Sequence, residues 1–203
     1  MNGFYRTRGK TLLDYFLVLL AIPVVLPLIG IVALLVALGG GSPFYTQRRL
    51  GRNGVVFNML KIRTMIPEAD EVLAAYLASN PEARREWNEK QKLCNDPRVT
   101  RLGGILRKTS LDELPQLWNV LRGDMSLVGP RPMTVAQKAL YPGRAYFEMR
   151  PGITGNWQVS DRNESSFVER ASFDEEYYWS VSLKTDIALL YSTVWVVIRG
   201  TGY

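Results

Sequence analysis

Histidine is absent from the 203 residues of this sequence, and cysteine occurs once, at Cys94. The lack of histidine excludes Ser-His and Cys-His catalytic pairs, histidine zinc sites and imidazole general bases. A lone thiol forms no intramolecular disulfide and no zinc cluster, which is typical of a protein in a reducing compartment. The side chains left for catalysis are carboxylates, Lys, Tyr, Ser and this thiol, which is more simply a bystander than a nucleophile.

Common nucleotide-binding motifs are also missing. The sequence has no GxxxxGK[ST] phosphate loop, no GxGxxG after a predicted strand and no DxD motif of metal-dependent glycosyltransferases. We therefore expect that any nucleotide is bound by neither a P-loop nor a Rossmann domain.

Positive charge is concentrated near the N-terminus. The chain carries a net charge of +6, to which residues 1–67 contribute +7 and the remaining residues −1. The basic clusters flank a segment of hydrocarbon side chains, so an anionic lipid surface is the partner that this region favours. The near-neutral remainder, in which carboxylates accompany the arginines, argues against binding to nucleic acid.

Residues 15–41 form an uncharged run of 27 residues, longer than the roughly 20 that span a bilayer. Pro23 and Pro27 lie within this run, and each lacks an amide donor and clashes with the preceding turn. A helix over residues 15–26 reaches only about 18 Å, short of a hydrocarbon core of about 30 Å. Basic residues flank both ends and favour the cytoplasmic side. We therefore predict, over residues 1–41, a re-entrant helix-break-helix that enters and leaves by the cytoplasmic face.

Two other interpretations of this run are a single spanning helix and a cleaved signal peptide. A single spanning helix with a proline kink stays open on the sequence alone, because neighbouring groups tolerate such kinks. A cleaved signal peptide is disfavoured. The apolar core of a signal peptide has about 7–15 residues and is followed by a small-residue cleavage site, whereas this run has 27 residues and no clear site of that kind follows it.

Residues 42–203 are predicted to form one compact cytosolic domain of the α+β class, mostly helical. Residues 67–80 and 81–93 each begin with Pro-Glu, as surface helices do. Two further predicted elements are a strand over residues 153–159 and a helix over residues 167–180. The apolar segment 186–199 is too short to span a bilayer, so we expect a helix packed on the body or lying in the membrane interface.

Apolar residues recur at helical spacing over residues 111–121 and predict an amphipathic helix with one buried stripe. The stripe consists of Leu111, Leu114, Leu117, Trp118 and Leu121. At the start of this helix, Ser110 and Glu113 fit a capping box, in which Asp112 would merely favour the positive end of the helix dipole.

Asp112 and Glu113 also fit a catalytic pair. Adjacent carboxylates on a helix diverge by about 100°, which suits two tasks such as attacking a phosphorus atom and holding a cation. A carboxylate at a helix N-terminus is held ionised, as a nucleophile or a Mg²⁺ ligand must be.

Arginines on stiffened turns favour this second interpretation. Arg131 lies between two prolines in GPRP, and Arg150 precedes a Pro-Gly turn in RPGITG. Each guanidinium group therefore sits on a stiff backbone and is preorganised to bind phosphate. Lys61 and Arg63, in KIRTM, follow the membrane segment at the level where lipid phosphates lie. The combination predicts phosphoryl transfer between a soluble anionic donor and a lipid phosphate.

The same segments resemble the bacterial sugar transferase family, the monotopic polyprenyl-phosphate phosphoglycosyl transferases. The resemblance covers nearly the whole chain, through Asp14 and the broken apolar run, QRRLGRNGVVFNMLKIRTM, SLDELPQLWNVLRGDMSLVGPRP and RPGITGNWQV. Within the family, the chain is similar to the short members that begin exopolysaccharide repeat units. One departure is that Leu26 precedes Pro27 where the family often has Ser, and that Pro23 is an additional proline.

The resemblance implies a reaction in two covalent steps. Asp112 would attack the β-phosphorus of a UDP-sugar and release UMP, and undecaprenyl phosphate would then attack the sugar-phosphoryl aspartate. Glu113 would help to hold Mg²⁺, with Asp112, or assist the lipid phosphate. Arg131 matches the phosphate-binding arginine of the family.

The remaining site residues are also implied by the resemblance. Arg150 and Asp174 match positions of the active-site cleft, and Lys61 and Arg63 match a basic element at the membrane surface. The enzyme would lie on the cytosolic face of the bacterial inner membrane, with a UDP-sugar, undecaprenyl phosphate and membrane lipid as partners and no nucleic acid. The resemblance implies a hexose, galactose or glucose, without fixing which of the two, and it is compatible with a homo-oligomer without fixing the oligomeric state.

A non-enzymatic alternative is a membrane-anchored adaptor. In that case the basic collar would bind anionic lipid, and Asp112 and Glu113 would serve only to cap a helix.

Overall fold

The computed structural model describes residues 3–91, 93–160 and 166–199, and this part of the chain is mostly helical with two small sheets. The α-helices are α1 (Lys10–Leu38), α2 (Ala69–Ser79), α3 (Pro81–Lys90), α4 (Arg101–Lys108), α5 (Gln116–Leu121), α6 (Ala145–Glu148), α7 (Asn156–Val159), α8 (Arg170–Ser180) and α9 (Leu183–Ile198). The strands are β1 (Phe44–Leu50), β2 (Val56–Ile62), β3 (Ser126–Val128) and β4 (Gly152–Thr154). The short helical turns are η1 (Tyr5–Gly9), η2 (Arg52–Gly54), η3 (Leu111–Glu113) and η4 (Ala136–Leu140). The α+β class with mostly helical content is therefore confirmed.

The two sheets hold segments that are distant in the chain beside one another. β1 and β2 are antiparallel, and the turn between them uses positive φ angles at Asn53 and Gly54, which these residue types adopt most readily. β3 and β4 are parallel. A Cβ atom added at Gly152 would lie 2.1 Å from the amide nitrogen of Gly129, so this close approach requires glycine.

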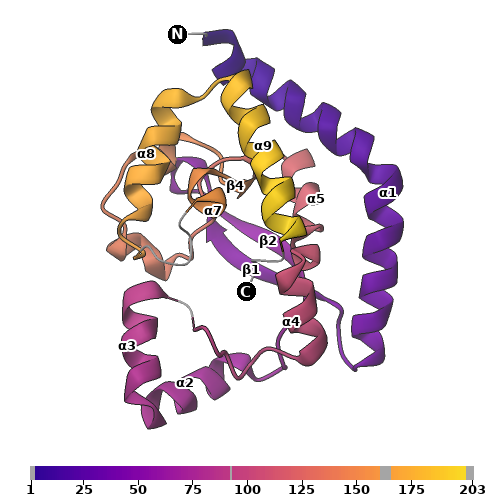
Figure 1. Ribbon diagram of the computed structural model, residues 1–203, viewed down its shortest axis with the longest axis vertical. Helices are drawn as coiled ribbons and strands as arrows, with labels where there is room; N and C mark the ends of the chain where they lie inside the picture. The colour runs from indigo at the N-terminus through magenta and orange to yellow at the C-terminus, as the bar shows by residue number, and fades with distance from the viewer. Residues whose placement is uncertain (1–2, 92, 161–165, 200–203) are drawn as a thin grey trace.

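Helix α1 continues through Pro23 and Pro27 without interruption. The two helices predicted from the prolines are therefore wrong, and the structure has one helix whose axis bends part-way along (Figure 1). The physical reason is that a proline removes one hydrogen bond and pushes the preceding turn aside, which kinks a helix more often than it ends one. The segment Tyr5–Leu38 is long and apolar enough to cross a membrane.

The beginning of α1 is anchored to the body by buried polar contacts. The Lys10 ammonium lies 2.6 Å from a carboxylate oxygen of Asp186, at the start of α9. One turn further on, buried Asp14 accepts hydrogen bonds from the Ser126 hydroxyl and the Leu127 amide, at 2.8 and 3.0 Å. The start of α1 is therefore fixed to both β3 and α9.

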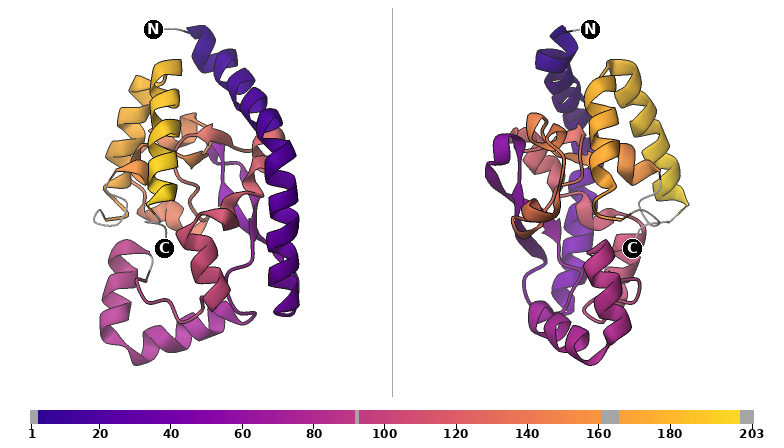
Figure 2. Two further views of the ribbon diagram at one scale, coloured as in Figure 1. Left: turned by 45° about the vertical axis from the view of Figure 1, so that its right-hand side comes forward. Right: turned by 90° about the vertical axis from the view of Figure 1, so that its left-hand side faces the viewer.

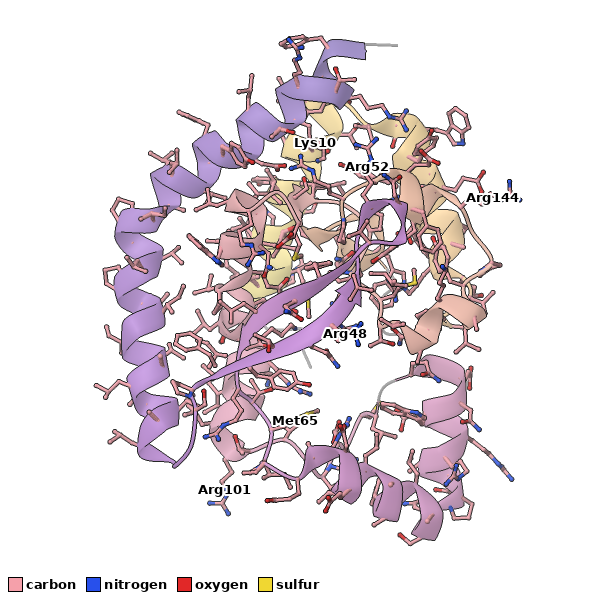
Figure 3. All side chains as sticks on the ribbon, turned by 180° about the vertical axis from the view of Figure 1, so that it is seen from behind. Lys10, Arg48, Arg52, Met65, Arg101 and Arg144 are labelled. Carbon is pink, nitrogen blue, oxygen red and sulfur yellow. The ribbon has the colours of Figure 1, made fainter. Side chains whose placement is uncertain are left out.

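The end of α1 is anchored to the same body. Val32 and Val36 pack in a buried cluster with Ile62 and Leu106, from β2 and α4. Figures 1 and 2 show α1 running along one side of the body. Seen from behind, Lys10 lies near one end of the molecule and Met65 near the other (Figure 3). The helix therefore contacts one folded domain near both of its ends.

The outward face of α1 is apolar. Its exposed large apolar side chains are Leu12, Phe16, Leu19, Leu20, Val24, Leu26, Ile31, Leu34, Leu35 and Leu38. Helix α9 also presents exposed apolar side chains, at Leu183, Ile187, Tyr191, Val194, Trp195 and Ile198. Large exposed apolar surfaces of this kind are typical of proteins that bind membranes.

Several local predictions are confirmed and one is wrong. The helices predicted over 67–80 and 81–93 are α2 and α3, and Asn80 caps α3 by accepting hydrogen bonds from the amides of Glu82 and Ala83. The strand predicted over 153–159 ends at Thr154, where β4 gives way to α7. Gly152, Gly155 and Trp157 allow either a strand or a helix locally, and the tertiary packing of the buried Trp157 favours the helix.

Candidate active site

Asp112 and Glu113 lie in the short turn η3, which precedes α5 rather than beginning it. Ser110 has a φ of 56° and its side chain caps no amide, so the capping-box interpretation is wrong. Pro115 takes the N-cap position of α5 instead. The helix predicted over 111–121 is thus divided, because Pro115 supplies no amide hydrogen to continue the turn.

Helix α5 buries polar side chains that hold it against β2. The side chain of Asn119 accepts a hydrogen bond from the Leu60 amide at 3.0 Å and donates one to the Asn58 carbonyl at 2.8 Å. Gln116 and Asn119 are almost fully buried, whereas Trp118, a member of the predicted buried stripe, is 57% exposed. The predicted buried stripe over residues 111–121 is therefore partly wrong, because Trp118 lies on an exposed face of α5. The bonds from Asn119 fix the register between α5 and β2, the strand that carries Lys61.

Lys61 joins the two carboxylates. Its ammonium nitrogen lies 2.7 Å from Oε1 of Glu113 and 3.7 Å from Oδ2 of Asp112. Asp112 is 5% exposed. The three side chains therefore form one cluster, whereas the sequence predicted the two carboxylates as a pair and Lys61 as a phosphate-binding residue at the membrane surface.

Burial raises the pKa of Asp112, and the positive charge of Lys61 opposes this shift. The neighbouring Glu113 carboxyl also raises the pKa of Asp112, whereas Arg107 and Arg131 lower it. The sequence predicted that a helix dipole holds this carboxyl ionised, but Asp112 lies before α5 and its carboxyl is desolvated. Nearby cations are therefore what favour its ionised form.

Arg131 lines a small hollow together with Lys61, Glu113 and Arg49. The Pro130–Pro132 turn that carries Arg131 is held by two other arginines, because Arg49 donates to the Pro132 carbonyl at 3.1 Å and Arg170 donates to the Arg131 carbonyl at 2.6 Å. Burial, with a smaller contribution from Arg131, lowers the pKa of Arg49 to about 10. Cations that repel one another in this way are stabilised by an anion between them.

Several buried polar side-chain atoms lack a hydrogen-bond partner in the described part of the chain, and two of them belong to the arginines that hold the Arg131 turn. Among the described residues, the Nε atoms of Arg49 and Arg170 and both polar side-chain atoms of Gln158 are buried without a hydrogen-bond partner. Buried polar groups of this kind are costly unless a ligand or water satisfies them. Of these residues Arg49 lines the hollow around Arg131, together with the cations Arg131 and Lys61, and this set of donors is suited to bind phosphate oxygens.

Asp174 lies behind the Arg131 turn. It is 3% exposed and accepts a hydrogen bond from the Tyr141 hydroxyl at 2.7 Å. Burial raises the pKa of Asp174 to about 6, against the opposing charge of Arg170. Asp174 thus supports Arg170, which in turn holds the backbone of Arg131.

Arg150 and Arg63 are engaged with α1 rather than with the carboxylate pair. Arg150 donates to Oδ2 of Asp14 at 3.2 Å and to Thr11 at 2.8 Å. Arg63 donates to the Gly40 carbonyl, just beyond the end of α1. These contacts tie both guanidinium groups to α1 and the residues just beyond it, and the phosphate-binding role of the two arginines stays a prediction.

The residues available for a metal are the two carboxylates. Within the described ranges, no group of three or more acidic or Cys side chains gathers as a metal site. Two carboxylates fit Mg²⁺, which is commonly bound by one or two protein carboxylates together with phosphate and water oxygens. Asp112 and Glu113 therefore fit the donor set of this ion only when a substrate phosphate completes it.

Comparison with known proteins decides the family. A model of the bacterial sugar transferases matches residues 5–200. The chain belongs to the bacterial sugar transferase family. This bacterial sugar transferase is 50% identical over 183 residues to the UDP-galactose-lipid carrier transferase of Erwinia amylovora, which covers 89% of the chain and 38% of that protein.

Two further relatives of this bacterial sugar transferase cover more of their own length. The exopolysaccharide production protein ExoY of Rhizobium meliloti is 48% identical over 174 residues, covering 85% of the chain and 77% of that protein. The UDP-glucose:undecaprenyl-phosphate glucose-1-phosphate transferase of Caulobacter vibrioides is 39% identical over 196 residues, with 91% and 68% covered. The chain thus spans well under half of the Erwinia protein but most of the other two.

Sequence reasoning missed four residues that shape the site of this bacterial sugar transferase: Arg49, Arg107, Arg170 and Asn119. The sequence singles out none of them, because a single arginine or asparagine carries no signal of its burial. Arg49 lies in the QRRLGRNG segment, and its place two residues before a tight glycine turn was the available clue.

Proposed function

We propose that this bacterial sugar transferase moves a hexose 1-phosphate from a UDP-sugar to undecaprenyl phosphate and releases UMP. The observation that carries the proposal is the buried Asp112 carboxylate beside the Lys61 ammonium, in a cluster with Glu113 and Arg131. The names of the Erwinia and Caulobacter relatives, which specify a UDP-sugar and a lipid carrier, support it.

In the first step, an oxygen of Asp112 attacks the β-phosphorus of the UDP-sugar. A bond forms between this oxygen and phosphorus, and the bond from phosphorus to the bridging oxygen breaks, so its electron pair leaves with UMP. The product is a sugar-phosphoryl aspartate. A covalent intermediate divides one difficult displacement into two easier ones, and it lets a water-soluble donor and a lipid acceptor use one site in turn.

In the second step, a phosphate oxygen of undecaprenyl phosphate attacks the same phosphorus. The bond to Asp112 breaks, the carboxylate is restored, and the product is a lipid diphosphate sugar. The acceptor phosphate is already ionised, so no histidine is needed to remove a proton, in agreement with the absence of histidine from the chain.

Lys61 and Arg131 neutralise the negative charge on the transferred phosphoryl group. Fixed positive charges contribute most of the catalysis in reactions of this type. Lys61 also keeps the desolvated Asp112 carboxyl ionised. Mg²⁺, held by Asp112 or Glu113 with phosphate oxygens, would add further charge neutralisation when bound.

The attachment of α1 to the body supports a position of this site at the level of lipid headgroups. Both ends of α1 contact one body, at Asp14 and at Val36, so that body lies on a single side of the bilayer. This favours a helix that enters and leaves by the same face over one that crosses. The basic residues at both ends assign that face to the cytoplasm, on the bacterial inner membrane.

The sugar and the pathway are assigned from the relatives. The Erwinia name specifies galactose, and the Caulobacter name specifies glucose. ExoY of Rhizobium meliloti is named for exopolysaccharide production. We therefore propose galactose or glucose as the sugar and the first membrane step of exopolysaccharide or other glycoconjugate synthesis as the setting.

Purified protein incubated with Mg²⁺, undecaprenyl phosphate and a panel of UDP-sugars tests this function. We expect UMP to be released with UDP-galactose or UDP-glucose and a lipid diphosphate sugar to form in equal amount. Release of UDP in place of UMP would show transfer of the sugar alone and would overturn the proposal. An absence of any turnover, together with binding to anionic lipid, would favour the adaptor.

A further inference from the structure

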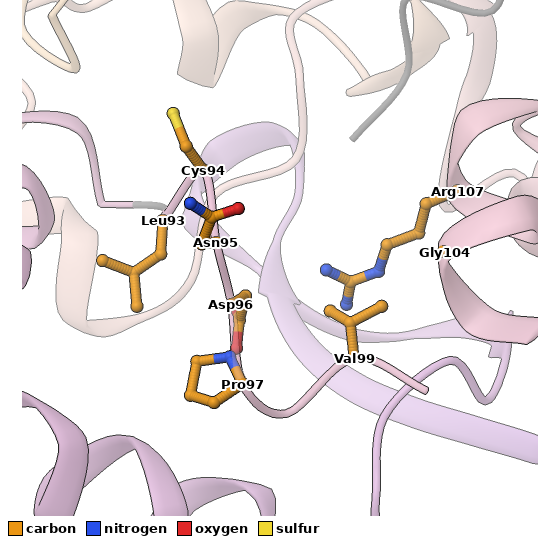
Figure 4. Close-up of a pocket in the computed structure, with 8 residues that line it drawn as sticks. All are labelled: Leu93, Cys94, Asn95, Asp96, Pro97, Val99, Gly104 and Arg107. Atoms are coloured by element: carbon orange, nitrogen blue, oxygen red, sulfur yellow. The ribbon is translucent and has the colours of Figure 1, made fainter. Parts of the chain in front are cut away.

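A cavity of about 480 Å³ lies between α4 and residues 93–99 (Figure 4), and it shares no lining residue with the hollow around Arg131. This volume is within the range of about 300–1,000 Å³ found for small-molecule sites. Its walls combine apolar Val99 and Pro97 with the polar side chains of Asn95 and Arg107. The cavity is thus built for a ligand with both apolar and polar surfaces.

The two faces of α4 explain why the cavity persists. Leu106, with Leu102, packs against the end of α1, whereas Gly104 and Arg107, three residues apart on another face, line the cavity. A Cβ atom added at Gly104 would meet no atom within 4 Å. The space beside Gly104 is therefore open.

Arg107 is positioned to bind an anion in this cavity. Its Nε atom donates to the Thr64 hydroxyl at 2.9 Å, which fixes the guanidinium group. Figure 4 shows this group directed toward residues 94–99. Asp96, the acid on that segment, is paired with Arg98 at 2.6 Å, and Arg107 forms no salt bridge with another described residue.

We propose that this cavity binds the nucleoside of the UDP-sugar and that Arg107 binds its diphosphate, an assignment that rests on the function proposed above. Arg107 links the cavity to the reacting atoms, since it lies on α4 and this helix contacts η3, the turn that carries Asp112. When the bond between the two phosphates breaks, the electron pair passes to UMP, and the fixed guanidinium stabilises the charge on this leaving group.

The chemistry of the cavity favours a nucleoside over the isoprenoid acceptor. The amide of Asn95 offers one donor group and one acceptor to a base edge, and Val99 and Pro97 offer apolar surface to a ring. A hydrocarbon chain would leave these polar groups unpaired. The exposed apolar side chains that suit it lie on α1 and α9 instead.

Cys94 provides a direct test, because it is exposed, lines the cavity and is the only thiol in the chain. The rate of alkylation of the intact protein by N-ethylmaleimide would be measured with UMP, UDP or undecaprenyl phosphate. At a nucleotide concentration about ten times its Kd, we expect the rate to fall about tenfold, because only that fraction of sites stays empty. Undecaprenyl phosphate should leave the rate unchanged.

Gly104→Leu tests the same assignment through kinetics. The leucine fills the cavity without a backbone clash, so we expect the KM for the UDP-sugar to rise at least about tenfold with little change in the KM for undecaprenyl phosphate. Arg101→Leu is the matched control, because it adds the same side chain to an exposed position of α4 near the end of the molecule (Figure 3).

The outcomes separate the two proposals. If the wild type releases UMP but nucleotides do not protect Cys94, or Gly104→Leu keeps the wild-type donor KM, the cavity assignment fails and the function stands. Protection by undecaprenyl phosphate alone would assign the cavity to the acceptor and would also overturn the inference. If the wild type releases no UMP from any UDP-sugar, the proposed function itself fails.

Discussion

The Lys61 ammonium lies 2.7 Å from Glu113 and 3.7 Å from Asp112, so one cation serves two adjacent carboxylates. This arrangement depends on the pairing of β2 with α5 through Asn119. It gives the two carboxylates different environments, since Asp112 is the more buried of the two.

Lys61→Met should lower kcat by about 100-fold, the order of effect seen when a fixed charge is removed from an active site. Without this ammonium, the pKa of Asp112 rises further, because burial is then opposed only by Arg107 and Arg131. We therefore expect the acidic limb of the profile of kcat against pH to move to higher pH. Lys61→Arg, which keeps the charge, should retain the wild-type limb, and an unchanged limb in Lys61→Met would contradict the assigned role.

Asn119→Ala should destabilise the protein by about 2 kcal/mol, because it leaves the part-buried Leu60 amide and Asn58 carbonyl without their partner. Thermal unfolding in detergent would measure the effect. Arg122→Ala, at an exposed position just beyond α5, is the control and should change stability by less than about 0.5 kcal/mol. Equal effects of the two substitutions would show that Asn119 does not hold the strand and helix together.

Asp174→Asn should make the stability of the protein less dependent on pH. The folded-state pKa of Asp174 is about 6, above its ordinary value of 3.8, so the folded state binds the proton more tightly than the unfolded state. Ionised Asp174 therefore costs stability above pH 6, on the order of 3 kcal/mol, and this cost disappears as the pH falls below 4. Melting temperatures should thus show Asp174→Asn gaining on the wild type as the pH rises from about 4 to about 6 and keeping this gain at higher pH, and a parallel pH dependence would count against the raised pKa.

A tag at the N-terminus should be inaccessible from outside intact cells, because both ends of α1 contact one body, for which we propose the cytosolic side. Labelling with a reagent that does not cross the membrane would measure this, and permeabilised cells provide the positive control. Labelling without permeabilisation would show that α1 spans the bilayer.

Much of the site was predictable because its chemistry is local. Asp112, Glu113 and Arg131 stand in motifs whose residue types alone indicate phosphate chemistry. Lys61 was predicted at the membrane surface, and only the antiparallel register of β1 and β2 and the buried Asn119 show that it reaches the carboxylates.

The errors arose where tertiary contacts override local preference. Pro23 and Pro27 bend α1 without ending it, since the body packs against both of its halves. The pairing of Arg150 with Asp14, more than a hundred residues earlier in the chain, was not predicted either, whereas its role as a phosphate ligand stays a prediction. No local pattern indicates such a contact.

Mass spectrometry of the protein incubated with donor alone is the most direct test of the covalent mechanism. With UDP-galactose or UDP-glucose and no undecaprenyl phosphate, we predict an adduct of one hexose phosphate on the peptide that contains Asp112, which disappears when undecaprenyl phosphate is added and is absent from Asp112→Asn. UMP release and lipid product without any such adduct, or an adduct that persists in Asp112→Asn, would contradict the assignment of Asp112 as the nucleophile.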